Sequence, residues 1–141
     1  MPELSITRLY LLRFCYALLF VGAGLTYWPM LVRDAASQPV LASACSAMLV
    51  AISVVAFFGL FSPVRLIPIL MFEAVWKVLW MAFVALPRWR SGTLDEEFVA
   101  ALFACSFVVP YLLFIPWRRV VATYLTQPER WGRRAAVGGV A

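Results

Sequence analysis

The sequence predicts an all-α fold: an integral membrane four-helix bundle, with both termini in the cytoplasm (N-in/C-in) and a basic interfacial C-terminal segment. The first observation is composition, because 65% of the 141 residues are apolar and only 13% are charged, with a mean hydropathy of +0.91. Soluble domains do not have such a composition. The second observation is that the apolar residues fall into four runs, each long enough for a span of about 20 residues. We therefore expect a single membrane domain over residues 1–141.

The first predicted span covers about residues 14–32 and follows the basic residues Arg8 and Arg13. A signal peptide has a similar basic start, but this run ends in Tyr-Trp-Pro at residues 27–29 instead of a small-x-small cleavage site. We therefore predict an uncleaved helix. Gly22 and Gly24 lie inside it and are expected to let another backbone approach closely.

The second predicted span covers about residues 40–61. Ser43, Ala47 and Ala51 recur in it at four-residue intervals. Small residues at this spacing are typical of close contact between membrane helices. We therefore expect these three residues to face a neighbouring helix.

The third predicted span covers about residues 66–86, with Pro68 near its start, where a missing N–H costs least. Pro87 and the polar residues up to Gly92 are expected to end it.

The fourth predicted span covers about residues 98–116. Asp95, Glu96 and Glu97 precede it, and carboxylates in a first turn suit the positive end of the helix dipole. Pro110 lies inside the span and removes a backbone donor, so we expect a kink and a freed carbonyl at Ser106.

The positions of the arginines predict the orientation. With both termini inside, eight arginines lie on the cytoplasmic side (8, 13, 65, 118, 119, 130, 133 and 134) and three lie outside (33, 88 and 90). This distribution satisfies the positive-inside rule. We therefore expect a multi-pass protein of a bacterial cytoplasmic (inner) membrane.

The segment from residue 117 to residue 141 is expected to be a cytoplasmic basic tail. Its arginines suit the anionic headgroups of that leaflet better than nucleic acid, because no separate basic fold lies outside the apolar spans. The predicted headgroup contacts are Arg118, Arg119, Arg130, Arg133 and Arg134. Docking of a partner protein on the tail is the alternative.

The candidate functional site is a stripe on the third span. Glu73, Trp76, Lys77 and Trp80 fall at i, i+3, i+4 and i+7, so they share one face of a helix. A charged side chain at the centre of a spanning helix costs roughly 2.5 to 3.5 kcal/mol on insertion scales, and this helix carries two. Glu four residues before Lys is the favourable order for an ion pair within one helix.

Two interpretations of the stripe stay open. In the first, Glu73 and Lys77 neutralise each other and fix the helix against its neighbours, through Tyr16, Thr26, Ser106 or the carbonyl freed by Pro110. In the second, the pair lines a cavity and binds the polar end of a ligand, with Trp76 and Trp80 as aromatic walls. The tryptophans also suit a simple core role, provided that each indole N–H finds an acceptor. Glu73 is a candidate acceptor for Trp76, because it lies three residues away on the same face.

No metal site or cofactor is expected. The sequence contains no histidine, and Cys15, Cys45 and Cys105 lie in apolar runs without metal-ligand spacing, which suggests small core residues. A disulfide between Cys45 and Cys105 is the less favoured alternative.

The chain resembles two groups of proteins. The stretch from Gly59 to Trp80 resembles a group of short bacterial inner-membrane proteins of four helices and unassigned activity. The residues that carry this resemblance are Gly59, Pro63, Arg65, Pro68, Phe72-Glu73, Trp76-Lys77 and Trp80. The same is true of the later Pro116-Trp117-Arg118 and Gln127-Pro128-Glu129-Arg130-Trp131. In size and span number the chain is also similar to DoxX-type proteins. These resemblances imply a four-helix membrane fold and transfer no activity.

Three classes of function fit these observations. The favoured class is a non-enzymatic membrane protein: an accessory subunit of a larger membrane complex, a homo-oligomer, or a bundle that binds lipid or another hydrophobic ligand. The second is a small proton-coupled transporter. The third is an intramembrane enzyme for a lipid, sterol-like or quinone substrate, with Glu73 as acid/base and Lys77 as the orienting group.

Overall fold

The computed structural model describes residues 4–126 and is helical throughout, with no strand in this part of the chain. Four helical rods are each long and apolar enough to cross a membrane, and they cover Ile6–Asp34, Val40–Gly59, Ile67–Ser91 and Glu96–Phe114. The elements are α1 (Ile6–Asp34), α2 (Val40–Gly59), α3 (Ile67–Trp80), the π-helical turn η1 (Met81–Ala85), α4 (Leu86–Ser91), α5 (Glu96–Ser106), α6 (Val108–Phe114), α7 (Trp117–Val121) and a second π-helical turn, η2 (Ala122–Thr126). The all-helical architecture and the four span-forming rods are thus confirmed.

The first rod is longer than the apolar run that predicted it. Helix α1 begins at Ile6, because the hydroxyl of Ser5 caps it by accepting a hydrogen bond from the backbone N–H of Arg8 at 3.4 Å. Residues 6–13, which precede the predicted span, are therefore helical as well. A side-chain cap of this kind satisfies one of the donors that a helix start leaves without a partner.

The third rod is also longer than predicted, because it continues through Pro87 and ends at Ser91. The backbone N–H of Leu86 donates to the carbonyl of Met81, five residues earlier, so the helix widens by one π-turn just before the proline. A wider turn accommodates a proline, which has no N–H and crowds the preceding turn. Gly92, with a φ of +74°, then ends the rod in the left-handed conformation that favours glycine.

The fourth rod is broken where the sequence predicted. Asp95 caps α5 through a 2.7 Å hydrogen bond from the N–H of Phe98, and Glu96 and Glu97 occupy the first turn. The helix is interrupted at Phe107 and resumes as α6. Pro110 lies one turn further on and cannot donate to the carbonyl of Ser106, which explains the break.

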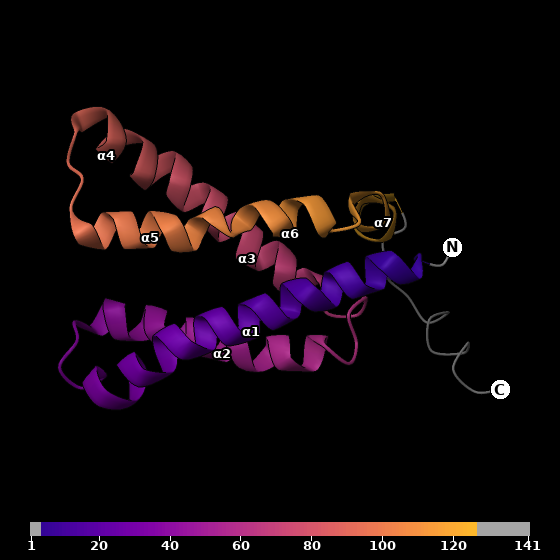
Figure 1. Cartoon of the computed structure of the whole chain (residues 1–141), viewed down its shortest axis with the longest axis horizontal. Coiled ribbons are helices and arrows are strands. Elements are labelled where there is room, and N and C mark those ends of the chain that lie inside the picture. Colours follow the sequence, from indigo (N-terminus) through magenta and orange to yellow (C-terminus); the bar gives the residue numbers. More distant parts are fainter. Residues whose placement is uncertain (1–3, 127–141) are drawn as a thin grey trace, which may run out of the picture.

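The small-residue face predicted on α2 is wrong as a contact within the chain, because Ala47 and Ala51 are exposed and only Ser43 is half-buried. The buried face of α2 instead includes Ser46, Ser53, Ala56 and Gly59. Helices α1 and α2 run side by side along this face (Figure 1).

Gly59 is required at its position, because a Cβ there would overlap the ring of Tyr16. The Tyr16 hydroxyl donates a 2.8 Å hydrogen bond to the carbonyl of Pro63, which fastens α1 to the turn between α2 and α3. Tyr16 is fully buried. This contact joins the first three rods at one end of the bundle.

The bundle has two different ends (Figure 1). The start of α1, the turn between α2 and α3, and α7 lie at one end, here called the terminal end, while residues 35–39 and 92–95 lie at the opposite, distal end. Both described ends of the chain are on the same side, as an even number of spans requires. The core lies mainly between α1, α3 and α6, around Leu12, Leu70 and Tyr111.

Large apolar side chains cover the outside of the bundle. Phe83 is 76% exposed, and Phe103 and Leu113 are each 67% exposed. Soluble monomers do not expose apolar surface on this scale, whereas lipid tails would cover it. The outer surface therefore agrees with four membrane-spanning helices.

Candidate functional site: an ion pair beside a cavity

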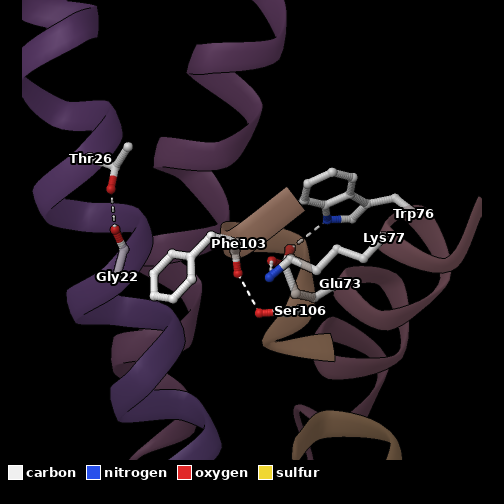
Figure 2. A network of polar contacts seen from close by, with 7 residues as sticks. All are labelled: Gly22, Thr26, Glu73, Trp76, Lys77, Phe103 and Ser106. Atoms are coloured by element: carbon white, nitrogen blue, oxygen red, sulfur yellow. Dashed lines mark hydrogen bonds and ion pairs between the residues drawn. The ribbon is translucent and has the colours of Figure 1, made fainter. Parts of the chain in front are cut away.

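Glu73 and Lys77 form a buried ion pair on α3. The Nζ of Lys77 lies 2.9 Å from Oε1 of Glu73, and both residues are almost completely buried (Figure 2). This is the only ion pair among residues 4–126. The i, i+4 spacing that predicted the pair is sufficient to form it, because residues four apart are neighbours on a helix surface.

Trp76 completes a three-residue network on the same helix. Its indole N–H donates a 2.6 Å hydrogen bond to Oε2 of Glu73. Each carboxylate oxygen therefore receives one donor, from Lys77 on one side and from Trp76 on the other. The predicted acceptor for the Trp76 indole is thus correct.

Trp80 lies on the same stripe but outside this network. It is half-buried, and its ring packs against Phe98 of α5 with 6.0 Å between the ring centroids. Trp80 therefore joins the third rod to the fourth by aromatic packing.

Tyr111 of α6 is a member of the site that sequence analysis missed. The Lys77 ammonium lies 5.1 Å from the centre of the Tyr111 ring and 5.7 Å from that of Trp76. Contacts at this distance are cation–π interactions. Tyr111 follows Pro110 by one residue, but only the packing of α6 on α3 shows that it reaches Lys77.

The pair makes no hydrogen bond to another helix within residues 4–126. The polar groups expected to reach it have other partners. Thr26 donates to the carbonyl of Gly22 at 2.8 Å, and Ser106 donates to that of Phe103 (Figure 2). Tyr16 donates to the carbonyl of Pro63, in the turn between α2 and α3. The prediction that Tyr16, Thr26 or Ser106 fixes the ion pair against the neighbouring helices is therefore wrong.

A cavity of about 320 Å³ lies beside the pair. Glu73, Trp76, Lys77 and Trp80 all line it, so the structure brings the four predicted stripe residues together at one space. The other lining residues come from α1, α2, α5, α6 and the break between α5 and α6: Leu18, Leu19, Gly22, Ala23, Thr26, Tyr27, Leu49, Ala101, Phe103, Ala104, Cys105, Phe107 and Tyr111.

The cavity opens sideways between α1 and α5. Its lining includes four exposed residues, Gly22 and Thr26 on α1 and Phe103 and Ala104 on α5. In Figure 2 the Phe103 ring lies between α1 and the ion pair. In a membrane this opening faces the lipid.

Gly22 does not serve the close helix contact that the sequence suggested. A Cβ added there would meet nothing within 4 Å, so the missing side chain is open space at the edge of the cavity. Gly24 has the side chain of Trp28 at 3.8 Å from its added Cβ and does not line the cavity. A pattern of small residues cannot distinguish a helix contact from a cavity wall.

The cysteines divide into two kinds, and all three are free thiols. Cys15 and Cys105 are buried, whereas Cys45 is exposed, so the core prediction is wrong for Cys45. Among the described residues no three acidic, cysteine or histidine side chains lie close enough to hold a metal ion.

A second, smaller cleft lies at the terminal end of the bundle. It has a volume of about 240 Å³ and is lined by Val64, Arg65, Ile67, Arg119, Val120, Thr123 and Tyr124. It contains one predicted headgroup residue, Arg119, while Arg118 is exposed nearby. The predicted contacts Arg130, Arg133 and Arg134 lie outside the described residues.

Comparison of the chain with protein-family models, with curated proteins and with solved structures gave no match. The resemblances noted from the sequence thus remain predictions.

Proposed function

We propose that this protein is a small, non-enzymatic membrane bundle that binds the head of a hydrophobic ligand in the cavity beside Glu73 and Lys77. The observation that supports this proposal most directly is the cavity itself, because all four residues of the stripe line it. A purely structural ion pair needs no such space, and tight packing around it would be more stable than a void.

The size and the opening of the cavity suit a ligand whose body remains in the lipid. Its volume of about 320 Å³ is at the lower end of the range of about 300–1,000 Å³ that is typical of ligand sites. The opening between α1 and α5 leads toward the lipid, where the remainder of the ligand would lie. Aromatic walls and a few polar groups are the usual lining of such sites.

The alternatives are a proton-coupled transporter and an intramembrane enzyme. Both need a route for protons, and Glu73 is the only acid in the described part of the chain that lines the cavity. Its two oxygens are already engaged by Lys77 and Trp76. This arrangement favours binding over proton transfer.

Mass spectrometry of hydrophobic molecules that co-purify with the protein would test the proposal. The informative variant is Gly22→Leu, which fills the cavity without a clash at the Cβ, and the matched control is Gly24→Leu on the same helix. We expect a molecule that co-purifies with the wild type and with the control but not with Gly22→Leu. Equal recovery from all three would overturn the proposal.

We further propose that anionic lipid headgroups bind at the terminal end, which places that end at the inner leaflet of a bacterial cytoplasmic membrane. The support is the second cleft, where Arg65 and Arg119 line one space together with the hydroxyl-bearing Thr123 and Tyr124. Each arginine near an anionic surface contributes on the order of 1 kcal/mol.

The headgroup proposal predicts selective lipid enrichment. The double variant Arg65→Gln/Arg119→Gln should lose anionic phospholipid from the lipids that co-purify, whereas Arg88→Gln/Arg90→Gln at the distal end should not. If both variants lose anionic lipid equally, the cleft has no special role.

A further inference from the structure

The polar groups of the cavity also indicate the chemistry of the ligand head. This inference rests on the proposed binding function. Three features matter: the net charge of the lining, the acceptors already in use, and the donors still available.

The net charge of the cavity lining is zero. Among residues 4–126, Glu73 and Lys77 are the only charged side chains that line it, and they neutralise each other at 2.9 Å. A charged ligand head would leave an unbalanced charge in the low-dielectric interior, which is strongly unfavourable. The lining therefore favours an uncharged head.

The acceptors of the pair are already in use. One oxygen of Glu73 faces the Lys77 ammonium, and the other accepts from the Trp76 indole at 2.6 Å. The indole N–H is used by the same bond. A ligand that brings only donors would have to displace one of these contacts.

Lys77 has more N–H donors than hydrogen-bonding partners among residues 4–126. An ammonium carries three N–H groups, and within residues 4–126 the Nζ of Lys77 has one hydrogen-bonding partner, Glu73. Its remaining contacts are the faces of the Trp76 and Tyr111 rings. A charged donor of this kind gives a stronger hydrogen bond than a neutral donor does.

The geometry points to an uncharged ligand with a hydrogen-bond-accepting oxygen, of the ketone, ester or quinone class, whose carbonyl accepts from Lys77. Its apolar body passes out between α1 and α5, and its head lies among Trp76, Tyr111 and Phe107. Nothing in this arrangement requires a covalent or redox step.

Four undecyl probes with bromine on carbon 6, close to the head, separate the possibilities: 6-bromo-2-undecanone, 6-bromoundecane, 6-bromoundecanoate and 6-bromoundecyltrimethylammonium. Each is titrated into the full chain in phospholipid nanodiscs, and quenching of tryptophan fluorescence reports proximity to Trp76 and Trp80. The cavity contribution is the part of the quenching that Gly22→Leu abolishes and Gly24→Leu retains.

We expect the ketone to bind about tenfold or more tightly than the alkane, as a hydrogen bond to a charged group implies, and both ionic probes to bind more weakly than the ketone. In Glu73→Gln/Lys77→Met, which stays neutral, the preference for the ketone should disappear while the alkane still binds. A circular dichroism spectrum equal to that of the wild type shows that this variant is folded.

Two results would overturn the inference while the proposed function stands: equal binding of ketone and alkane, or tighter binding of an ionic probe. If none of the probes shows quenching that depends on Gly22, the proposed function itself fails and the inference fails with it.

Discussion

Trp76 and Trp80 lie one turn apart on one face, yet only Trp76 bonds to the ion pair. The difference arises from spacing, because Trp76 is three residues from Glu73 and Trp80 is seven residues away, beyond reach of the carboxylate. One tryptophan therefore supports the charge and the other supports helix packing.

Replacement of Trp76 by Phe tests this difference. Trp76→Phe removes the donor to Glu73 but keeps an aromatic ring, and it should lower the free energy of unfolding by about 1 kcal/mol, the usual scale for a hydrogen bond between membrane side chains. Trp80→Phe is the matched control for the loss of an indole. Unfolding in sodium dodecyl sulfate, followed by circular dichroism, measures both. Equal effects would show that the bond to Glu73 contributes nothing.

Removal of one charge should cost more than removal of both. Lys77→Met leaves a buried carboxylate without its counter-ion and should destabilise the protein by about 3 kcal/mol or more. Glu73→Gln/Lys77→Met removes both charges and keeps an amide oxygen that can still accept from Trp76. The double variant is therefore expected to be more stable than Lys77→Met in the same unfolding assay. The single variant Glu73→Gln completes the cycle: if its effect and that of Lys77→Met simply add up to the effect of the double variant, the ion pair has no coupling energy.

At the scale of helices, the contact between Gly59 and Tyr16 shows that α1 and α2 pack closely at the terminal end of the bundle. Gly59→Ala inserts a methyl group into the Tyr16 ring, and overpacking of this kind costs typically about 1–3 kcal/mol. Gly24→Ala adds the same methyl group at an ordinary contact distance and should be nearly neutral. Unfolding of the two variants, compared side by side, measures the difference. A neutral Gly59→Ala would show that α1 and α2 can separate at this point.

The sequence predicted the features that depend on a single helix. The ion pair, the Trp76 bond and the break before Pro110 all follow from spacing or from a missing N–H within one rod. The π-turn before Pro87 was missed, because a proline can end a helix or be accommodated in it, and local sequence does not distinguish these outcomes. The cavity was missed as a defined space for another reason: Gly22, Tyr111 and Phe103 come from three elements, and their proximity depends on how α1, α5 and α6 pack.

Orientation is a property of the whole molecule, and the excess of arginines at the terminal end predicts that this end is cytoplasmic. In a background without the three native cysteines, Ser37→Cys and Ser91→Cys at the distal end should react with a membrane-impermeant maleimide added to intact bacterial cells. Ser62→Cys at the terminal end should react only after the membrane is permeabilised. The opposite pattern would invert the topology and would place the Arg65 and Arg119 cleft at the outer leaflet.

The placement of the ion pair within one helix also bears on biosynthesis. Each charge alone would oppose entry of the third rod into the bilayer by roughly 2.5 to 3.5 kcal/mol. Because Glu73 and Lys77 pair across a single helical turn, helix α3 carries no net charge as soon as its own residues have been synthesised. It need not wait for a counter-charge from a later helix. The Tyr111 ring lies more than thirty residues further along the chain, so on insertion in chain order it would reach Lys77 only after the third rod had entered the bilayer.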